Sequence, residues 1–137
     1  MDLKSVARDI LIKGIKAVDP YSCIMNAVHF TEEGIHIGKE IYPFSIFTKI
    51  LVIGGGKASA RMGKAIEDIL CDYISAGWIN TKYGHSITLN RVHIHECGHP
   101  LPDERGPPAI AAHTGVIGWG VVAIGHARGP AADHLRA

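Results

Sequence analysis

The sequence lacks the features that mark secreted, membrane and nucleic-acid-binding proteins. No apolar run approaches the roughly 20 residues that a membrane span needs. The first residues also lack the uninterrupted apolar stretch of a signal peptide. The formal net charge is only +1, so electrostatics gives no reason to expect a nucleic-acid or anionic-membrane partner. We therefore expect a cytoplasmic protein that binds neither nucleic acid nor membrane.

Cysteine is scarce, and its spacing excludes the common cysteine motifs. The chain has three cysteines, Cys23, Cys71 and Cys97, and no Cys-x-x-Cys pair. A zinc knuckle or a dithiol redox motif is therefore disfavoured. Three reduced cysteines fit a cytosolic protein.

Histidine, by contrast, is clustered within residues 93–99. An extended strand would place four alternating side chains on one face: His93, His95, Cys97 and His99. Such a row could bind zinc or copper, but ligands two residues apart on one strand rarely close a tetrahedral site alone. We therefore favour a polar edge of hydrogen-bonded imidazoles and predict no metal site.

Hydrophobic residues make up 47% of the 137-residue chain, enough for the core of one domain. Apolar residues at helical spacing predict an amphipathic helix over residues 3–18. Asp19-Pro20 then breaks it and starts a second helix over 21–29. Glycines within residues 30–48 indicate a short strand or hairpin.

A strand, a tight turn and a helix form the clearest signal in the chain. Residues 49–53 are an unbroken apolar run, as in a buried strand, and 58–73 have helical spacing. Further strands are predicted over 78–81 and 91–96. Strands and helices in this order predict an α/β fold: a partial, Rossmann-like open parallel sheet with flanking helices, truncated after the third strand.

The composition changes after Gly106, and we divide the chain there into residues 1–106 and 107–137. The second part contains no Lys and no Glu and is dominated by Ala, Gly, Pro and His. The sequence there gives only a weak signal, or none, for the helix expected to cover the third strand. Residues 116–125 could form a strand interrupted by glycine. Our hypothesis is that this divergent tail is an out-of-frame read, which the downstream reading frames would test.

The turn after the first strand carries the chemistry. Gly54, Gly55 and Gly56 allow the backbone to turn sharply and to approach a ligand closely. The following helix points free N–H groups and its positive dipole end at the same spot. Lys57 adds a mobile cation. The turn therefore suits a phosphate or carboxylate, and a plain strand–helix turn with a solvated lysine is the open alternative.

Two better-known phosphate-binding motifs are not present in this turn. A Walker A loop would need Gly where the chain has Leu51, and Ser or Thr where it has Ala58. The dinucleotide-binding motif Gly-x-Gly-x-x-Gly would need Gly at Ser59.

Three segments in order resemble one known family. Residues 51–59, LVIGGGKAS, are similar to the strand–loop–helix of glycerate 2-kinases of the MOFRL type. Residues 81–85, TKYGH, resemble the exit of that family's second strand, and 98–104, GHPLPDE, resemble its Gly-His-Pro-x-Pro-Asp-Glu turn. The helix around residues 7–20 fits as well, so the resemblance covers residues 3–106.

The resemblance implies a phosphotransferase reaction: transfer of the ATP γ-phosphoryl group to the 2-hydroxyl of D-glycerate, with Mg²⁺ bridging the phosphates. Members have two α/β domains and are sometimes labelled hydroxypyruvate reductases. Lys57 matches the family's active-site cation and is the expected catalytic residue. The expected substrate- or phosphate-binding residues are Gly54, Gly55, Gly56, Ser59, Lys82, His85, His99 and Asp103. Hydrogen bonds that merely stabilise loops remain the alternative role for the last four.

The family is much longer than this chain, which lacks a second glycine-rich loop and the C-terminal domain. We therefore expect little or no kinase activity from the chain alone, no tight binding of ATP or Mg²⁺, and self-association through an uncovered sheet edge. One alternative is a small anion- or phosphate-binding α/β module without catalysis. Another is an independent protein whose tail forms a fourth strand or an oligomer interface.

Overall fold

The chain begins with two helices, as its apolar spacing predicts. In the computed structural model, which describes residues 2–98 and 121–126, α1 spans Leu3–Ala17 and α2 spans Pro20–Ala27. The Asp19 carboxylate caps α2 by accepting the amide of Ser22 at 3.0 Å. The second helix ends two residues before the predicted end at residue 29, because Val28 already belongs to a strand.

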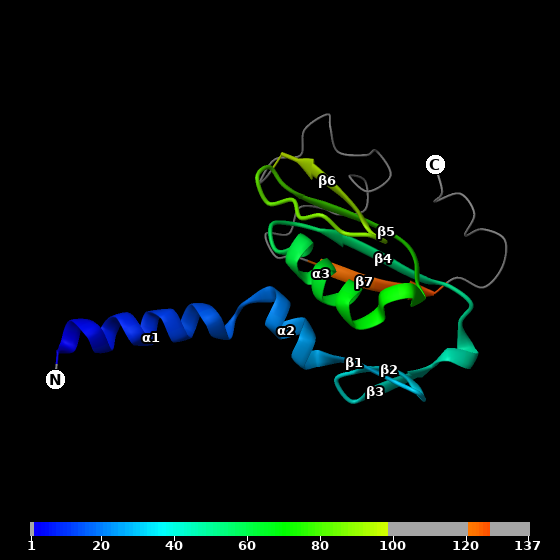
Figure 1. The fold of residues 1–137 in the computed structure, drawn as a ribbon, viewed down its shortest axis with the longest axis horizontal. Helices are drawn as coiled ribbons and strands as arrows, with labels where there is room; N and C mark the ends of the chain where they lie inside the picture. The colour runs from blue at the N-terminus through cyan, green and yellow to red at the C-terminus, as the bar shows by residue number, and fades with distance from the viewer. Residues whose placement is uncertain (1, 99–120, 127–137) are drawn as a thin grey trace.

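α1 projects away from the rest of the molecule (Figure 1). None of its residues is buried, and its apolar side is open, with Leu3 77% and Ile10 66% exposed. The helix is therefore the amphipathic element that the sequence predicts, but its apolar side does not pack on the described core.

A small antiparallel sheet follows α2. Its strands are β1 (Val28–Thr31), β2 (Gly34–Ile37) and β3 (Glu40–Pro43), in the order β1-β2-β3. The predicted hairpin is therefore confirmed, with one strand more. Aromatic rings join this sheet to the main body, because Phe30 lies 4.7 Å and Phe44 5.2 Å from Tyr73, between ring centroids.

The main sheet has the strand order β6-β5-β4-β7 (Figure 1). Its strands are β4 (Ile50–Gly55), β5 (Ile74–Lys82), β6 (His93–Cys97) and β7 (Val121–His126). The helix α3 (Ser59–Leu70) connects β4 to β5. The predicted α/β class and the three parallel strands are confirmed. β7 adds an antiparallel strand along the outer edge of β4, overlapping the range 116–125 where the sequence allowed a strand.

α3 covers one face of the main sheet and encloses the core. Ile66 and Leu70 on the helix meet Val52 and Ile79 on the strands, and all four are almost fully buried. Ile53, in the next position of β4, is 41% exposed. The strand predicted to be buried throughout is thus buried mainly on the face that α3 covers.

Only the first connection between parallel strands contains an α-helix. Residues 83–92, all of which the structure describes, join β5 to β6 through a turn at 83–84 and bends at 90–92, with no helix or strand between them. This connection is held by other contacts, which include bonds from two carboxylate side chains. No helix in the described part of the chain is both long and apolar enough to cross a bilayer.

Candidate functional site

The glycine turn at the end of β4 is built by its backbone. Gly54 and Gly55 are the last residues of β4, and Gly56 turns the chain with φ of +112°. Residues that carry a Cβ rarely adopt that φ, so glycine is required at this position. The Gly56 amide donates to the carbonyl oxygen of Asn80 at 3.0 Å, which fixes the turn against β5.

Ser59 braces this turn from inside the protein. Its side chain is fully buried, and its hydroxyl lies 2.5 Å from the Gly56 carbonyl oxygen and 3.0 Å from that of Asn80. Its amide also donates to the Gly56 oxygen, at 3.2 Å. Both donors of Ser59 therefore point at protein carbonyls, and this predicted phosphate-binding residue supports the turn from behind.

The N-terminus of α3 and Lys57 meet directly after the turn. The cap residue Ala58 makes no side-chain hydrogen bond to the helix end. The partial positive charge of the helix N-terminus is thus not offset by a capping carboxylate. Lys57 is exposed and forms no ion pair with any residue that the structure describes. A helix N-terminus beside a solvated ammonium group is chemically suited to an anion.

The exit of β5 lies at the same edge of the sheet. Gly55 of β4 is in register with Asn80 of β5, and both strands run in the same direction. Lys82 is the last residue of β5 and is half-buried, whereas His85 is exposed. The His85 amide donates to the Lys82 carbonyl oxygen at 3.0 Å, closing a turn with Gly84 at φ +74°. The structure therefore brings the predicted residues Lys82 and His85 to the edge where the glycine turn lies.

Glu96 holds this second turn, and sequence reasoning missed it. One oxygen of its carboxylate accepts the amides of Gly84 at 2.9 Å and Ser86 at 3.1 Å. Glu96 is in register with Thr81 on the neighbouring strand. Its position inside the predicted third strand was visible in the sequence, but its partners lie 10 and 12 residues away.

A second carboxylate anchors the other end of the same connection. Glu67 of α3 is only 6% exposed and accepts the amide of Asn90 at 2.9 Å and that of Arg91 at 2.6 Å. The signal in the sequence was an acidic residue among the apolar residues of the helix, beside Ile66 and Leu70. A buried carboxylate needs such donors, because burial without them costs several kcal/mol.

The alternating histidines pack against an aromatic ring. The imidazole of His93 lies 4.2 Å from the indole of Trp78, and that of His95 lies 6.1 Å from it, between centroids. The indole N–H donates to the Asn80 side-chain oxygen at 2.9 Å. The other two candidates, His99 and Asp103, lie outside the described residues.

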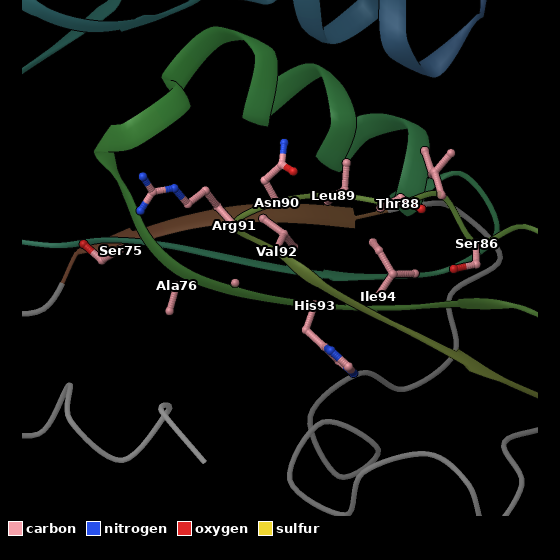
Figure 2. A pocket seen from close by; sticks show the side chains of 12 residues that line it. Ser75, Ala76, Ser86, Thr88, Leu89, Asn90, Arg91, Val92, His93 and Ile94 are labelled. Carbon is pink, nitrogen blue, oxygen red and sulfur yellow. The ribbon is translucent and has the colours of Figure 1, made fainter.

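An open hollow of about 530 Å³ lies beside the β5–β6 connection (Figure 2). It is lined by residues 75–77 at the start of β5 and by residues 86–94. None of the candidate catalytic or anion-binding residues that the structure describes lines it. The hollow is therefore separate from the glycine turn, and we do not assign the anion site to it.

The shifted pKa values also lie elsewhere, at the junction of α2 and α3. The hydrogen bond from Lys64 lowers the pKa of Asp68, partial desolvation opposes this, and a bond from Tyr21 at 2.9 Å lowers it further. The pKa of Asp19 is lowered mainly by its bonds to Ser22 and also by Arg61 at 2.5 Å. These ionic contacts join α2 to α3 and have no part in the anion site.

Comparison with known proteins identifies the family. Residues 6–117 match the family model described as "Domain of unknown function (DUF4147)". The chain belongs to this family. The DUF4147 domain is the N-terminal region of glycerate 2-kinases, so the resemblance that the three sequence segments carry is confirmed.

Two curated relatives of this DUF4147 chain are named as glycerate kinases. A "Glycerate 2-kinase" of Pyrococcus horikoshii is 42% identical over 106 residues, which are 77% of this chain and 23% of the relative. A "D-glycerate 2-kinase" of Thermotoga maritima is 35% identical over 103 residues, 74% of this chain and 21% of the relative.

A solved structure agrees. The crystal structure of the PH0495 protein from Pyrococcus horikoshii matches with a TM-score of 0.65 and 37% identity, over 77% of this chain and 23% of that one. The chain thus spans about a quarter of the length of the relatives it matches.

Proposed function

We propose that this chain supplies the anion-binding part of an ATP-dependent D-glycerate 2-kinase and acts in the cytoplasm. The observation that carries the proposal is the glycine turn, held by Ser59 and Asn80 and followed at once by exposed Lys57 and the N-terminus of α3. The names of the two relatives supply the reaction. Three free cysteines favour a reducing compartment.

The proposed role of the turn is to bind and neutralise negative charge. Phosphoryl transfer depends mostly on positioning and on electrostatic stabilisation of the transferring group. Lys57 and the helix N-terminus would hold the glycerate carboxylate or the transferring phosphoryl group. Lys82 and His85, at the same sheet edge, would contact the same anion. ATP would supply the phosphoryl group, and Mg²⁺ would neutralise phosphate charge. We assign Mg²⁺ to none of the described candidates, because none is a carboxylate.

We propose that the 137-residue chain binds the anion without catalysing the reaction. The described site lies at one open edge of a sheet, and phosphoryl transfer needs a second wall to exclude water and align the reactants. The chain spans about a quarter of its relatives, whose remaining length would provide that wall. The second candidate function, an anion-binding module without catalysis, rests on the same turn.

Titration of the labelled chain with inorganic phosphate and with D-glycerate tests the proposal. We expect amide shifts at Gly54–Lys57 and around His85, and no ATP-dependent formation of 2-phosphoglycerate. Lys57→Met should abolish the shifts and leave the urea midpoint unchanged, because the side chain is exposed. Lys39→Met is the matched control, since it removes the same charge from an exposed position between β2 and β3.

Two results would contradict the proposal. One is the absence of shifts at the glycine turn with millimolar phosphate or glycerate. The other is a Lys57→Met chain that binds as tightly as the Lys39→Met chain. Measurable turnover by the purified chain would contradict the proposal that the chain binds without catalysing, because one side of the site would then be sufficient for the reaction.

A further inference from the structure

The connection between β5 and β6 is fixed at both ends by carboxylates. Glu96 binds it next to the candidate site, through Gly84 and Ser86. Glu67 binds it at the far end, through Asn90 and Arg91. In a helix the backbone N–H groups donate to backbone carbonyl oxygens. In this connection several N–H groups donate to glutamate side chains instead. The two glutamates thus replace part of the hydrogen bonding that a crossover helix would supply.

The bonds at the near end determine the shape of one turn. Three consecutive amides are bonded: Gly84 and Ser86 to Glu96, and His85 to the carbonyl oxygen of Lys82. Gly84 has φ of +74°, a conformation that an L-residue rarely adopts. Because these amides are fixed, the backbone positions from which the Lys82 and His85 side chains extend are also fixed.

We propose that Glu96 is a positioning residue for the anion site. By accepting the amides of Gly84 and Ser86, its carboxylate holds the Lys82–His85 turn at the edge where the Gly54–Lys57 turn ends. The two N–H groups also offset its negative charge, so that a carboxylate is tolerated close to a bound anion. This inference rests on the proposed function of the same site, and it concerns a residue that touches the turn and not the ligand.

Glu67 provides a matched control within the same connection. It makes the same kind of bond, from carboxylate to consecutive backbone amides, and it is more deeply buried than Glu96. Figure 2 labels Asn90 and Arg91, its partners, among the residues that line the hollow. Removing Glu67 should loosen the connection at its far end and leave the Lys82–His85 turn bonded to Glu96.

Phosphate binding by the 137-residue chain and three variants tests the inference. Glu96→Ala should raise the phosphate Kd about fivefold to tenfold, since two bonds that order the turn are lost. Glu96→Gln should stay within about twofold of the original Kd, because the amide oxygen can accept both N–H groups. Glu67→Ala should lower the urea midpoint but leave the phosphate Kd within about twofold.

The outcomes separate the two proposals. If the unaltered chain binds no phosphate, the proposed function fails, and the inference fails with it. If the unaltered chain binds phosphate and Glu96→Ala binds equally well, only the positioning role fails. The same holds if Glu67→Ala weakens binding as much as Glu96→Ala does.

A second variant covers the case in which Glu96→Ala does not fold. Ser86→Pro removes one of the two donors from the other side of the bond. It should raise the phosphate Kd about threefold, and an unchanged Kd would overturn the inference.

Discussion

The amide of Gly56 donates a hydrogen bond of 3.0 Å to the carbonyl oxygen of Asn80. This bond joins the turn after β4 to β5 two residues before Lys82. Ser59 reaches the same oxygen with its hydroxyl at 3.0 Å. One backbone carbonyl therefore fixes the glycine turn to β5, the strand that ends at Lys82.

Gly56→Ala should destabilise the chain and weaken anion binding together. The φ of +112° at Gly56 is strained for any residue with a Cβ, and such strain costs about 1–3 kcal/mol. Urea unfolding measures the loss, and phosphate titration measures the binding. Gly14→Ala is the control: nothing lies within 4 Å of its added Cβ, and alanine favours a helix by up to about 1 kcal/mol. Equal stability of Gly56→Ala and the unaltered chain would contradict the assigned backbone conformation.

Gly63 lets α3 approach the sheet, and its replacement should show a specific rescue. An added Cβ at Gly63 would lie 2.3 Å from Cδ1 of Ile79. Overpacking of this kind costs about 1–3 kcal/mol, partly offset by the better helix propensity of alanine. Ile79→Val removes that Cδ1 at a cost of about 0.5–1.5 kcal/mol.

We therefore expect the Gly63→Ala/Ile79→Val double variant to be more stable than the sum of the two single effects predicts. A double-mutant cycle from urea unfolding gives the coupling free energy. Additive effects would show that the helix does not lie this close to β5.

Cys71→Gly should stabilise the chain. Cys71 follows α3 with φ of +45° and ψ of −120°, a conformation suited to glycine. Relief of this strain should exceed the larger chain entropy of glycine and raise the free energy of unfolding by about 0.5–1 kcal/mol. Cys71→Ala removes the thiol but keeps the Cβ, so it should bring no gain. A stabilised Cys71→Ala would instead attribute the effect to the thiol.

The ion pair between Asp68 and Lys64 makes stability depend on acid pH. Because the folded-state pKa of Asp68 is lowered, its contribution is present above the unfolded pKa of about 4 and is lost as the pH falls through the folded pKa. The urea midpoint should fall between about pH 4 and pH 2 by less in Asp68→Asn than in the unaltered chain. Asp19, with its own lowered pKa, stays in both proteins and cancels in the comparison. Identical acid slopes would contradict the assigned role of Asp68.

The parts of the fold that the sequence predicts correctly are those that depend on local patterns. The β4–α3 turn follows from three glycines between an apolar run and a helical repeat, and Asp19-Pro20 marks the start of α2. Each of these signals acts within a few residues, where propensity and capping decide the structure.

Contacts between distant residues could not be predicted in this way. Glu67 and Glu96 bind amides 10 to 24 residues away, and nothing in their own neighbourhood specifies those partners. The antiparallel pairing of β7 with β4 likewise depends on the sheet edge and not on the sequence of Val121–His126. For Ser59, the composition of the turn suggested a ligand contact, and only the packing shows a hydroxyl directed inward.

The exposed α1 has a consequence for hydrogen exchange. Its 15 residues bury no side chain, and a helix of that length is only marginally stable in water without tertiary packing. Its amides should therefore exchange with deuterium through helix–coil fraying, close to the rate of an isolated peptide, whereas those of α3 exchange only when the core opens. Slow exchange along the stripe of Leu3, Ile10 and Ile15 would reveal that another surface has covered it.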